Sequence, residues 1–187
     1  MFSDVKVANG ATYEIDLESA ADSVFYSKII SGSGSFLKSG PGRLGFDQTH
    51  TYTGSTTISD GALVMSGDGT GGIGSLSNST AVTVDNSATF ALRVEDDTVG
   101  SIAGSGAIYL ASQRLTFGED NTNTEFSGVV SGTGGITKVG SGVGSGVGSG
   151  SGMTSHTFEV APSVQVAVVG PEPLTVNTPL STIVKPV

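Results

Sequence analysis

The side chains that could carry catalysis are few and scattered in this sequence of 187 residues. Two histidines occur, His50 and His156, and no Gly-x-Ser-x-Gly element places a nucleophile near either of them. We therefore predict no hydrolase triad. The chain contains no cysteine, which excludes disulfides, thiolate catalysis and cysteine-based zinc sites.

Two clusters of acidic residues contain the carboxylates that calcium binds, at residues 95–97 (EDD) and 119–120 (ED). Neither has the alternating Asp/Asn spacing and the late Glu of a calcium loop. Residues 68–74 (DGTGGIG) are similar to the glycine-rich calcium nonapeptide, but Ser75 and Leu76 stand where its aspartate is required. We interpret the acidic groups as solvated corners and predict no metal site.

The remaining candidates for a cofactor or substrate site are weak. The Gly-Ser-Gly runs at 32–34 and 104–106 are not followed by a P-loop Lys-Ser/Thr, so we interpret them as turns and predict no cofactor. The tyrosines are too scattered for a sugar platform: Tyr13, Tyr26, Tyr52 and Tyr109. Some β-helices are polysaccharide lyases, but the paired carboxylates that such chemistry needs are not identified. We predict no catalytic residues, with a carbohydrate-active enzyme as the weaker alternative.

Charge and hydropathy exclude two further classes of protein. Seventeen acidic against eight basic residues give a net charge of −9, and no Lys/Arg cluster could track a phosphate backbone, so we expect no nucleic-acid binding. No apolar run approaches the roughly 20 residues that a membrane span needs. The first residues, 1–4 (MFSD), are not typical of a secretory signal peptide.

The elements that would position any site are predicted to be short strands. Glycine makes up 29 of the residues, and Ser, Thr and Val are abundant, a mixture that suits strands and turns and disfavours helix. Apolar residues recur at every second position in several runs. This alternation predicts inward side chains at Phe36, Leu44, Phe46, Leu63, Leu92, Leu115 and Phe117.

One segment of the chain is repeated one hundred residues later. Residues 30–42 (ISGSGSFLKSGPG) align without gaps on 130–142 (VSGTGGITKVGSG), with identity at six of thirteen positions. Shared glycine follows from composition, but the shared Lys38 and Lys138 do not. Strand, tight corner and strand, repeated without room for a crossover helix, indicate a stacked β-solenoid.

The repeat resembles a known family. GSGSFLKSGPGRLGF, TYTGSTTISDGALVMSG, AVTVDNSATFAL and TNTEFSGVVSGTGGITKVGSG are similar to the passenger-associated repeats (autotransporter-associated β-strand repeats) of bacterial autotransporter passenger domains. The resemblance covers residues 5–142 and implies an all-β fold, a right-handed single-stranded parallel β-helix. The sequence departs from the family at Arg43 and Gly45, where a small polar residue and Thr or Ser are usual. We expect an altered solvent face there.

The resemblance also implies a role. Passengers of this family are secreted and stay at the bacterial surface, attached to the outer membrane in the full-length parent. It implies a non-catalytic stalk or display region of an adhesin, acting in cell-surface adhesion or aggregation. The expected partner is a protein or glycan on a host or neighbouring cell.

The composition divides the chain into three segments. Residues 1–142 form the predicted β-helix, and residues 143–152 are rich in Gly, Ser and Val, which indicates a flexible linker. The regularity of this linker favours an engineered origin over natural low complexity. Residues 153–187 hold five of the six prolines and one glycine, so we interpret them as a separate strand-forming segment, an extended tail or a tethered partner peptide.

The tail is expected to contact the β-helix. A solenoid cut within a repeat exposes unpaired backbone groups, which a tethered strand can cover by β-augmentation. The predicted contact residues are Phe158, Val160, Val164, Val166 and Val168. In the alternative reading the chain is a binding module fused to its partner peptide. A disordered extension and a dimer through the solenoid end or edge also stay open.

Overall fold

The computed structural model describes residues 3–67, 73–78, 80–142, 144–145, 148–149, 155–159 and 175–177, with side chains up to residue 142. Within these residues the chain forms strands and no helix, and every strand pairing is parallel. No described segment is a helix that is long and apolar enough to cross a membrane.

The largest sheet has seven strands and lies along the whole stack. Its strands are β3 (Ser23–Tyr26), β6 (Arg43–Phe46), β8 (Gly61–Met65), β10 (Ala88–Leu92), β13 (Ala107–Tyr109), β16 (Val129–Ser131) and β19 (Gly148–Ser149).

Two five-stranded sheets and two strand pairs complete the fold. One sheet contains β2 (Thr12–Asp16), β5 (Ser35–Ser39), β7 (Thr56–Ile58), β9 (Ala81–Val84) and β12 (Ser101–Gly104). The other contains β11 (Asp97–Val99), β14 (Arg114–Phe117), β17 (Gly135–Lys138), β20 (Ser155–Glu159) and β21 (Thr175–Asn177). The pairs are β1 (Val5–Val7) with β4 (Ile30–Gly32), and β15 (Thr124–Glu125) with β18 (Gly144–Ser145).

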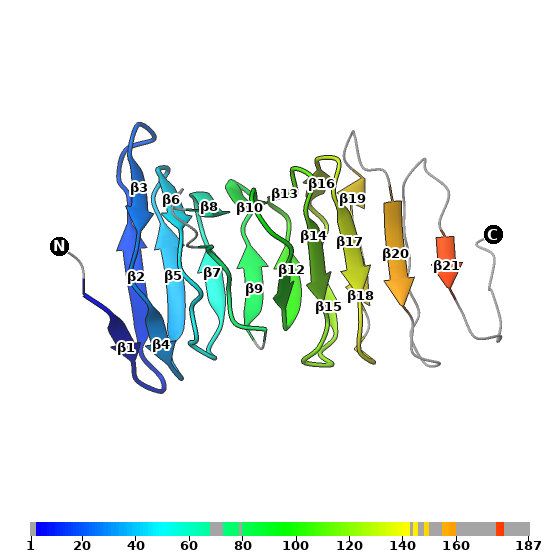
Figure 1. The fold of residues 1–187 in the computed structure, drawn as a ribbon, viewed down its shortest axis with the longest axis horizontal. Helices are drawn as coiled ribbons and strands as arrows, with labels where there is room; N and C mark the ends of the chain where they lie inside the picture. The colour runs from blue at the N-terminus through cyan, green and yellow to red at the C-terminus, as the bar shows by residue number, and fades with distance from the viewer. Residues whose placement is uncertain are drawn as a thin grey trace.

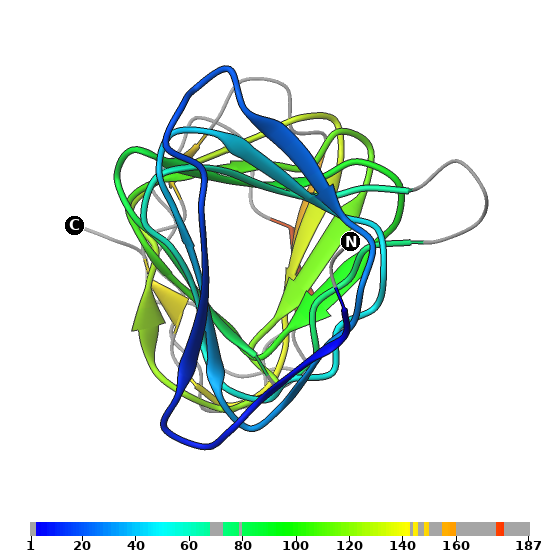
Figure 2. The ribbon, with the colours of Figure 1, turned by 90° about the vertical axis from the view of Figure 1, so that its left-hand side faces the viewer.

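The sheets are the sides of one stack of turns. Figure 1 shows the strands side by side in sequence order from blue to red, and Figure 2 shows successive turns lying one behind another. Each turn pairs with the next through backbone hydrogen bonds, at a spacing of about 4.8 Å. The predicted parallel β-solenoid is confirmed.

The core is a set of inward rows that run along the stack. One row joins Leu44, Leu63, Phe90, Ile108 and Val130, which are direct partners on successive strands and are all buried. Each inward residue therefore covers the one in the turn before it. All seven residues that the alternation predicts to be inward are buried, so this prediction is confirmed.

Glycine corners set the bends between sheets, and the two copies of the repeat use them alike. Gly32 and Gly132 have φ values of 100° and 109°, and Gly40 and Gly140 have φ values of 69° and 70°. A Cβ on Gly32 would also lie 2.2 Å from the Val7 carbonyl oxygen in the preceding turn. Only glycine combines this backbone conformation with such a close approach between turns.

Strands also occur beyond residue 142. The short strands β18 and β19 lie within the segment predicted to be a linker, and they pair with β15 and β16. Strand β20 pairs with β17, and β21 pairs with β20. The division of the chain into β-helix, linker and tail stays a prediction.

Candidate functional site

The predicted partner-binding residues fall mostly outside the described residues. Phe158 lies in β20, where its backbone is opposite Lys138 of β17. Val160, Val164, Val166 and Val168 lie outside the described part of the chain. Their role in covering the β-helix stays a prediction.

The two histidines occupy different parts of the stack. His156 lies in β20 opposite Ile136. His50 is buried, and its ring centroid lies 3.9 Å from that of Phe46, beside Tyr26 and Tyr52. His50 belongs to an aromatic cluster that fills the first turns of the core. Its ring is not open to solvent, so it is not placed to act as a base on a bound substrate.

The His50 ring is held by one hydrogen bond. Its Nδ1 accepts the backbone N–H of Ile30 at 3.1 Å, so the neutral ring carries its proton on Nε2. Nε2 has no hydrogen-bond partner among the described residues. Burial lowers the pKa of His50 to about 4, which keeps the ring neutral at pH 7.

Asp97 corrects the prediction that the acidic groups are solvated corners. Glu95 and Asp96 are exposed, but Asp97 is only 7% exposed. Its Oδ2 accepts the Leu76 N–H at 3.1 Å and its Oδ1 accepts the Thr98 N–H at 2.9 Å. Burial raises the pKa of Asp97 to about 7, against the lowering effect of these two hydrogen bonds. Sequence reasoning missed this residue because two exposed acidic neighbours precede it.

The structure does not gather polar side chains into a reactive cluster within its described residues. No group of three or more His, Asp or Glu side chains in that part could hold a metal ion. Tyr26 and Tyr52 are interior, whereas Tyr109 faces outward, so the tyrosines do not form one platform. Tyr52 shares a 2.5 Å hydrogen bond with Thr56 inside the core.

The outer face of the seven-stranded sheet is where large side chains reach solvent. Phe25 on β3 and Tyr109 on β13 are 50% and 39% exposed. They belong to one outward row, in which direct partners on successive strands are Phe25, Gly45, Val64, Ala91 and Tyr109. We call these five residues the outer row.

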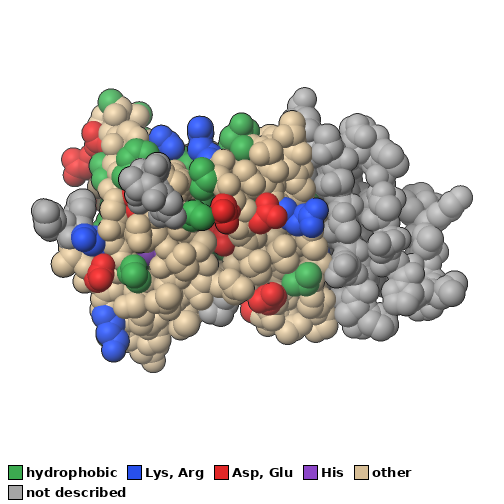
Figure 3. Space-filling model, viewed as in Figure 1, with side chains coloured by type: hydrophobic (Ala, Val, Ile, Leu, Met, Phe, Trp, Pro, Cys, Tyr) green, Lys and Arg blue, Asp and Glu red, His purple; other side chains and the backbone are tan. Residues whose placement is uncertain are grey.

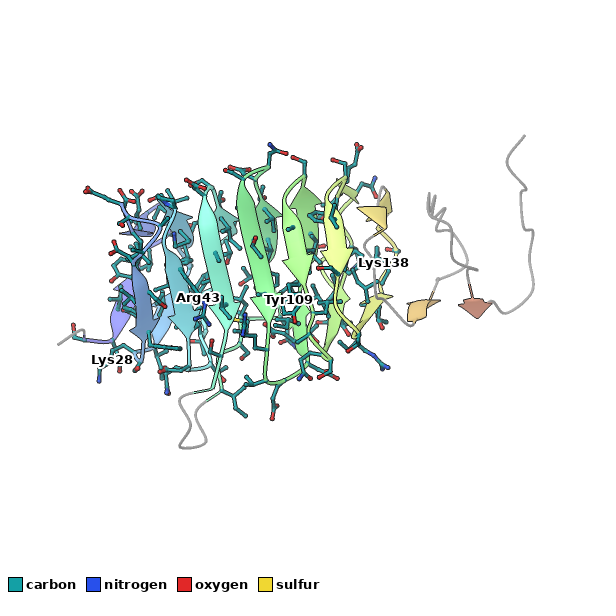
Figure 4. All side chains as sticks on the ribbon, turned by 90° about the horizontal axis from the view of Figure 1, so that it is seen from above. Lys28, Arg43, Tyr109 and Lys138 are labelled. Atoms are coloured by element: carbon teal, nitrogen blue, oxygen red, sulfur yellow. The ribbon has the colours of Figure 1, made fainter. Side chains whose placement is uncertain are left out.

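Each aromatic end of the outer row has an arginine beside it. The Arg43 guanidinium carbon lies 5.9 Å from the centroid of the Phe25 ring, and that of Arg93 lies 5.9 Å from the centroid of the Tyr109 ring. Figure 4 shows Arg43 and Tyr109 on the same side of the stack, in different turns. This arrangement can bind a ligand that has both flat apolar surface and negative charge.

The fold defines the class of protein, a parallel β-solenoid, and one comparison indicates its relatives. The chain is 32% identical over 138 residues to the "Adhesin BmaC autotransporter" of Brucella suis biovar 1 (strain 1330). The match covers 71% of this chain and 4% of that protein, so the chain spans a small fraction of its relative. The relative and the fold together confirm the resemblance to autotransporter passenger domains that the repeat predicts.

Two further comparisons give no match. No protein-family model matches the chain, and no solved structure matches it.

Proposed function

We propose that this chain is a non-catalytic adhesion segment of a secreted autotransporter passenger, which displays its outer faces at the bacterial surface. The observation that carries the proposal is the similarity to an autotransporter adhesin over most of the chain. The expected partner is a protein or glycan on a host or neighbouring cell.

The architecture supports a display role because it separates stability from surface chemistry. Inward rows such as Leu44, Leu63 and Phe90 pack turn on turn, and the backbone groups of neighbouring turns bond to each other. Outward side chains take no part in this stacking. A solenoid can therefore carry binding residues on its outer rows at little cost in stability.

A bead assay tests the adhesion proposal. Beads coated with the chain are expected to attach to cultured epithelial cells or to aggregate with one another, more than beads coated with a non-solenoid protein of similar net charge. Attachment and aggregation that both stay at the level of the control beads would overturn the proposal.

A second candidate function is a binding module that captures residues 153–187 by strand addition. The pairing of β20 with β17 supports it, because a parallel strand extends the sheet beyond the end of the repeat. Separate expression distinguishes this candidate: residues 1–142 should then bind a synthetic peptide of residues 153–187. A peptide that shows no binding in titration calorimetry would exclude the candidate.

A further inference from the structure

The outer row is built differently from the faces around it. Between its two exposed aromatic ends lie Gly45, Val64 and Ala91, which are all buried. Phe25 and Tyr109 are four strand spacings apart, roughly 19 Å along the stack. The part of the row that a ligand can reach is therefore its two ends, each with an exposed ring and an arginine.

The Phe25 ring packs closely against Gly45, its partner on the next strand. A Cβ on Gly45 would lie 2.7 Å and 2.8 Å from Cδ1 and Cε1 of the Phe25 ring, so any other residue would push the ring away. One side of the ring thus rests over β6, while half of the side chain stays exposed. The exposed part of the ring can contact the apolar face of a ligand.

An arginine lies over each of these rings. At 5.9 Å from the ring centroids, the guanidinium groups of Arg43 and Arg93 sit near the outer limit of a cation–π contact. Each can turn its planar fork toward a carboxylate or sulfate on a ligand that lies along the row.

The charge of this face is opposite to that of the chain. Its outward strand residues include one arginine and no acidic residue: Ser23, Phe25, Arg43, Gly45, Ala62, Val64, Thr89, Ala91, Ala107, Tyr109, Val129 and Ser131. Arg93 follows β10, and acidic residues flank the face only in turns, as at Asp22 and Glu95. Asp47, after β6, is buried and accepts the Ser27 hydroxyl. Figure 3 shows Lys/Arg and hydrophobic side chains close together along the upper side of the body. In a chain of net charge −9, this local pattern favours an anionic ligand.

A polysaccharide fits this face better than a peptide does. The strands within the sheet bond to their neighbours on both sides, so the face offers no free backbone groups to an added peptide strand. It offers ring faces and arginine forks, which suit the apolar faces and the acidic groups of sugar units. The length of the row requires an extended ligand of several units.

From these observations we propose that the two ends of the outer row, Phe25 with Arg43 and Tyr109 with Arg93, bind an acidic polysaccharide that spans them along the solenoid axis. This inference rests on the proposed adhesion function and names its ligand class. Phe25 and Tyr109 stack on sugar rings, and Arg43 and Arg93 bind the acidic groups.

The test uses the whole chain and defined polymers. Binding of fluorescently labelled polygalacturonate, a sugar polymer with carboxylates, is measured by anisotropy and compared with neutral dextran and with poly-glutamate. We expect polygalacturonate to bind, dextran to bind at least about tenfold more weakly because the arginine contacts are lost, and poly-glutamate likewise because it cannot stack. Raising the salt concentration should weaken polygalacturonate binding.

Two double variants assign the binding to this row. One double variant replaces both arginines, Arg43→Gln with Arg93→Gln, and the other replaces both rings, Phe25→Leu with Tyr109→Leu. Each is expected to weaken polygalacturonate binding about tenfold. The leucines keep apolar bulk on the sheet, so folding is retained. The matched control is Lys6→Gln with Arg114→Gln, which removes two exposed positive charges from β1 and β14 and should leave binding unchanged.

Several outcomes would overturn the inference. They are absence of polygalacturonate binding, equal weakening in the Lys6/Arg114 control, equal binding of poly-glutamate, and unchanged binding in the leucine variant. The adhesion function is judged separately by the bead assay. Beads that attach to cells but are neither inhibited by polygalacturonate nor weakened by the leucine variant would contradict this site and leave the adhesion proposal standing.

Discussion

Lys38 and Lys138 hold the same buried position in the two copies of the repeat. Both side chains are almost fully buried, and each Nζ donates a hydrogen bond to the backbone carbonyl of the next residue, Ser39 or Val139. Lys38 Nζ also donates to the Gly40 carbonyl at 2.7 Å. Burial lowers the pKa of both lysines. The ammonium group thus supplies donors at the corner, where the Ser39 carbonyl also accepts the Leu17 N–H at 3.1 Å.

Replacing Lys38 by Met should destabilise the fold. The apolar stem would still fill the interior, but the Gly40 carbonyl would lose the Lys38 donor and the Ser39 carbonyl would keep only the Leu17 N–H. The expected cost is about 1–3 kcal/mol in the free energy of unfolding. Urea unfolding followed by circular dichroism measures this change. Lys6→Met, at an exposed position on β1, is the control and should have little effect. Equal stability of the two variants would show that the corner does not need the lysine.

Phe46→Ala should cost about 3–5 kcal/mol of unfolding free energy, as for other buried Phe truncations. Phe46 is fully buried, with ring centroids 5.1 Å from Phe36 and 3.9 Å from His50, so the change opens a cavity in the aromatic cluster. Thermal or urea unfolding measures the loss. Phe25→Ala removes the same atoms from a half-exposed ring and should cost clearly less. A wild-type melting temperature for Phe46→Ala would contradict the observed packing.

His50 and Asp97 should give opposite pH dependences of stability. The pKa of His50 is about 4 in the fold and ordinarily 6.5, so its contribution to stability falls as the pH falls from about 6.5 to 4. The pKa of Asp97 is about 7 in the fold and ordinarily 3.8, so its contribution falls as the pH rises from about 4 to 7. The two effects offset each other, each by at most about 1.4 kcal/mol per pH unit.

Two variants separate these effects. In His50→Gln, stability should decrease with rising pH between about 4 and 7, because Asp97 acts alone. In Asp97→Asn, stability should increase with pH up to about 6.5, because His50 acts alone. Unfolding in urea at several pH values measures both slopes, and the double variant is the control for the remaining titratable groups. Identical slopes in all four proteins would refute the assignment.

The backbone amides of β20 should exchange slowly with solvent if the tail adds to the β-helix. Thr157 and Phe158 are paired with Thr137 and Lys138 of β17. Hydrogen exchange measured by mass spectrometry would then show protection of residues 155–159 relative to an added Gly/Ser tag. Exchange as fast as in that tag would exclude docking of the tail.

Removal of metal ions should leave stability unchanged. Several acidic side chains of the described residues hold turns, as Asp120 does by accepting the Thr122 N–H at 3.0 Å. Melting curves before and after dialysis against a chelator provide the measurement. A lower melting temperature that calcium restores would reverse this expectation.

Much of the fold follows from local patterns. Alternation such as Leu44-Gly45-Phe46 determines which face of a strand is buried, and glycine corners determine where each strand ends, so both could be predicted from sequence. The shared Lys38 and Lys138 also marked a real structural equivalence, although their burial was not evident from residue type.

The outer row could not be predicted because its residues come together only through the register between turns. Successive members of the row are separated by 20, 19, 27 and 18 residues in the sequence, in the order Phe25, Gly45, Val64, Ala91 and Tyr109. These unequal steps follow no fixed period. The one signal was the departure of Arg43 and Gly45 from the family pattern. In the structure Arg43 lies over the Phe25 ring, and Gly45 lies against that ring.

The direction of the backbone hydrogen bonds has a mechanical consequence. Because these bonds join one turn to the next, a pulling force along the axis would separate the turns one at a time rather than shear all strands together. Each step would release about 20 residues, or roughly 70 Å of chain. A passenger built in this way would yield in small increments under tension from a moving cell and would dissipate energy at every turn.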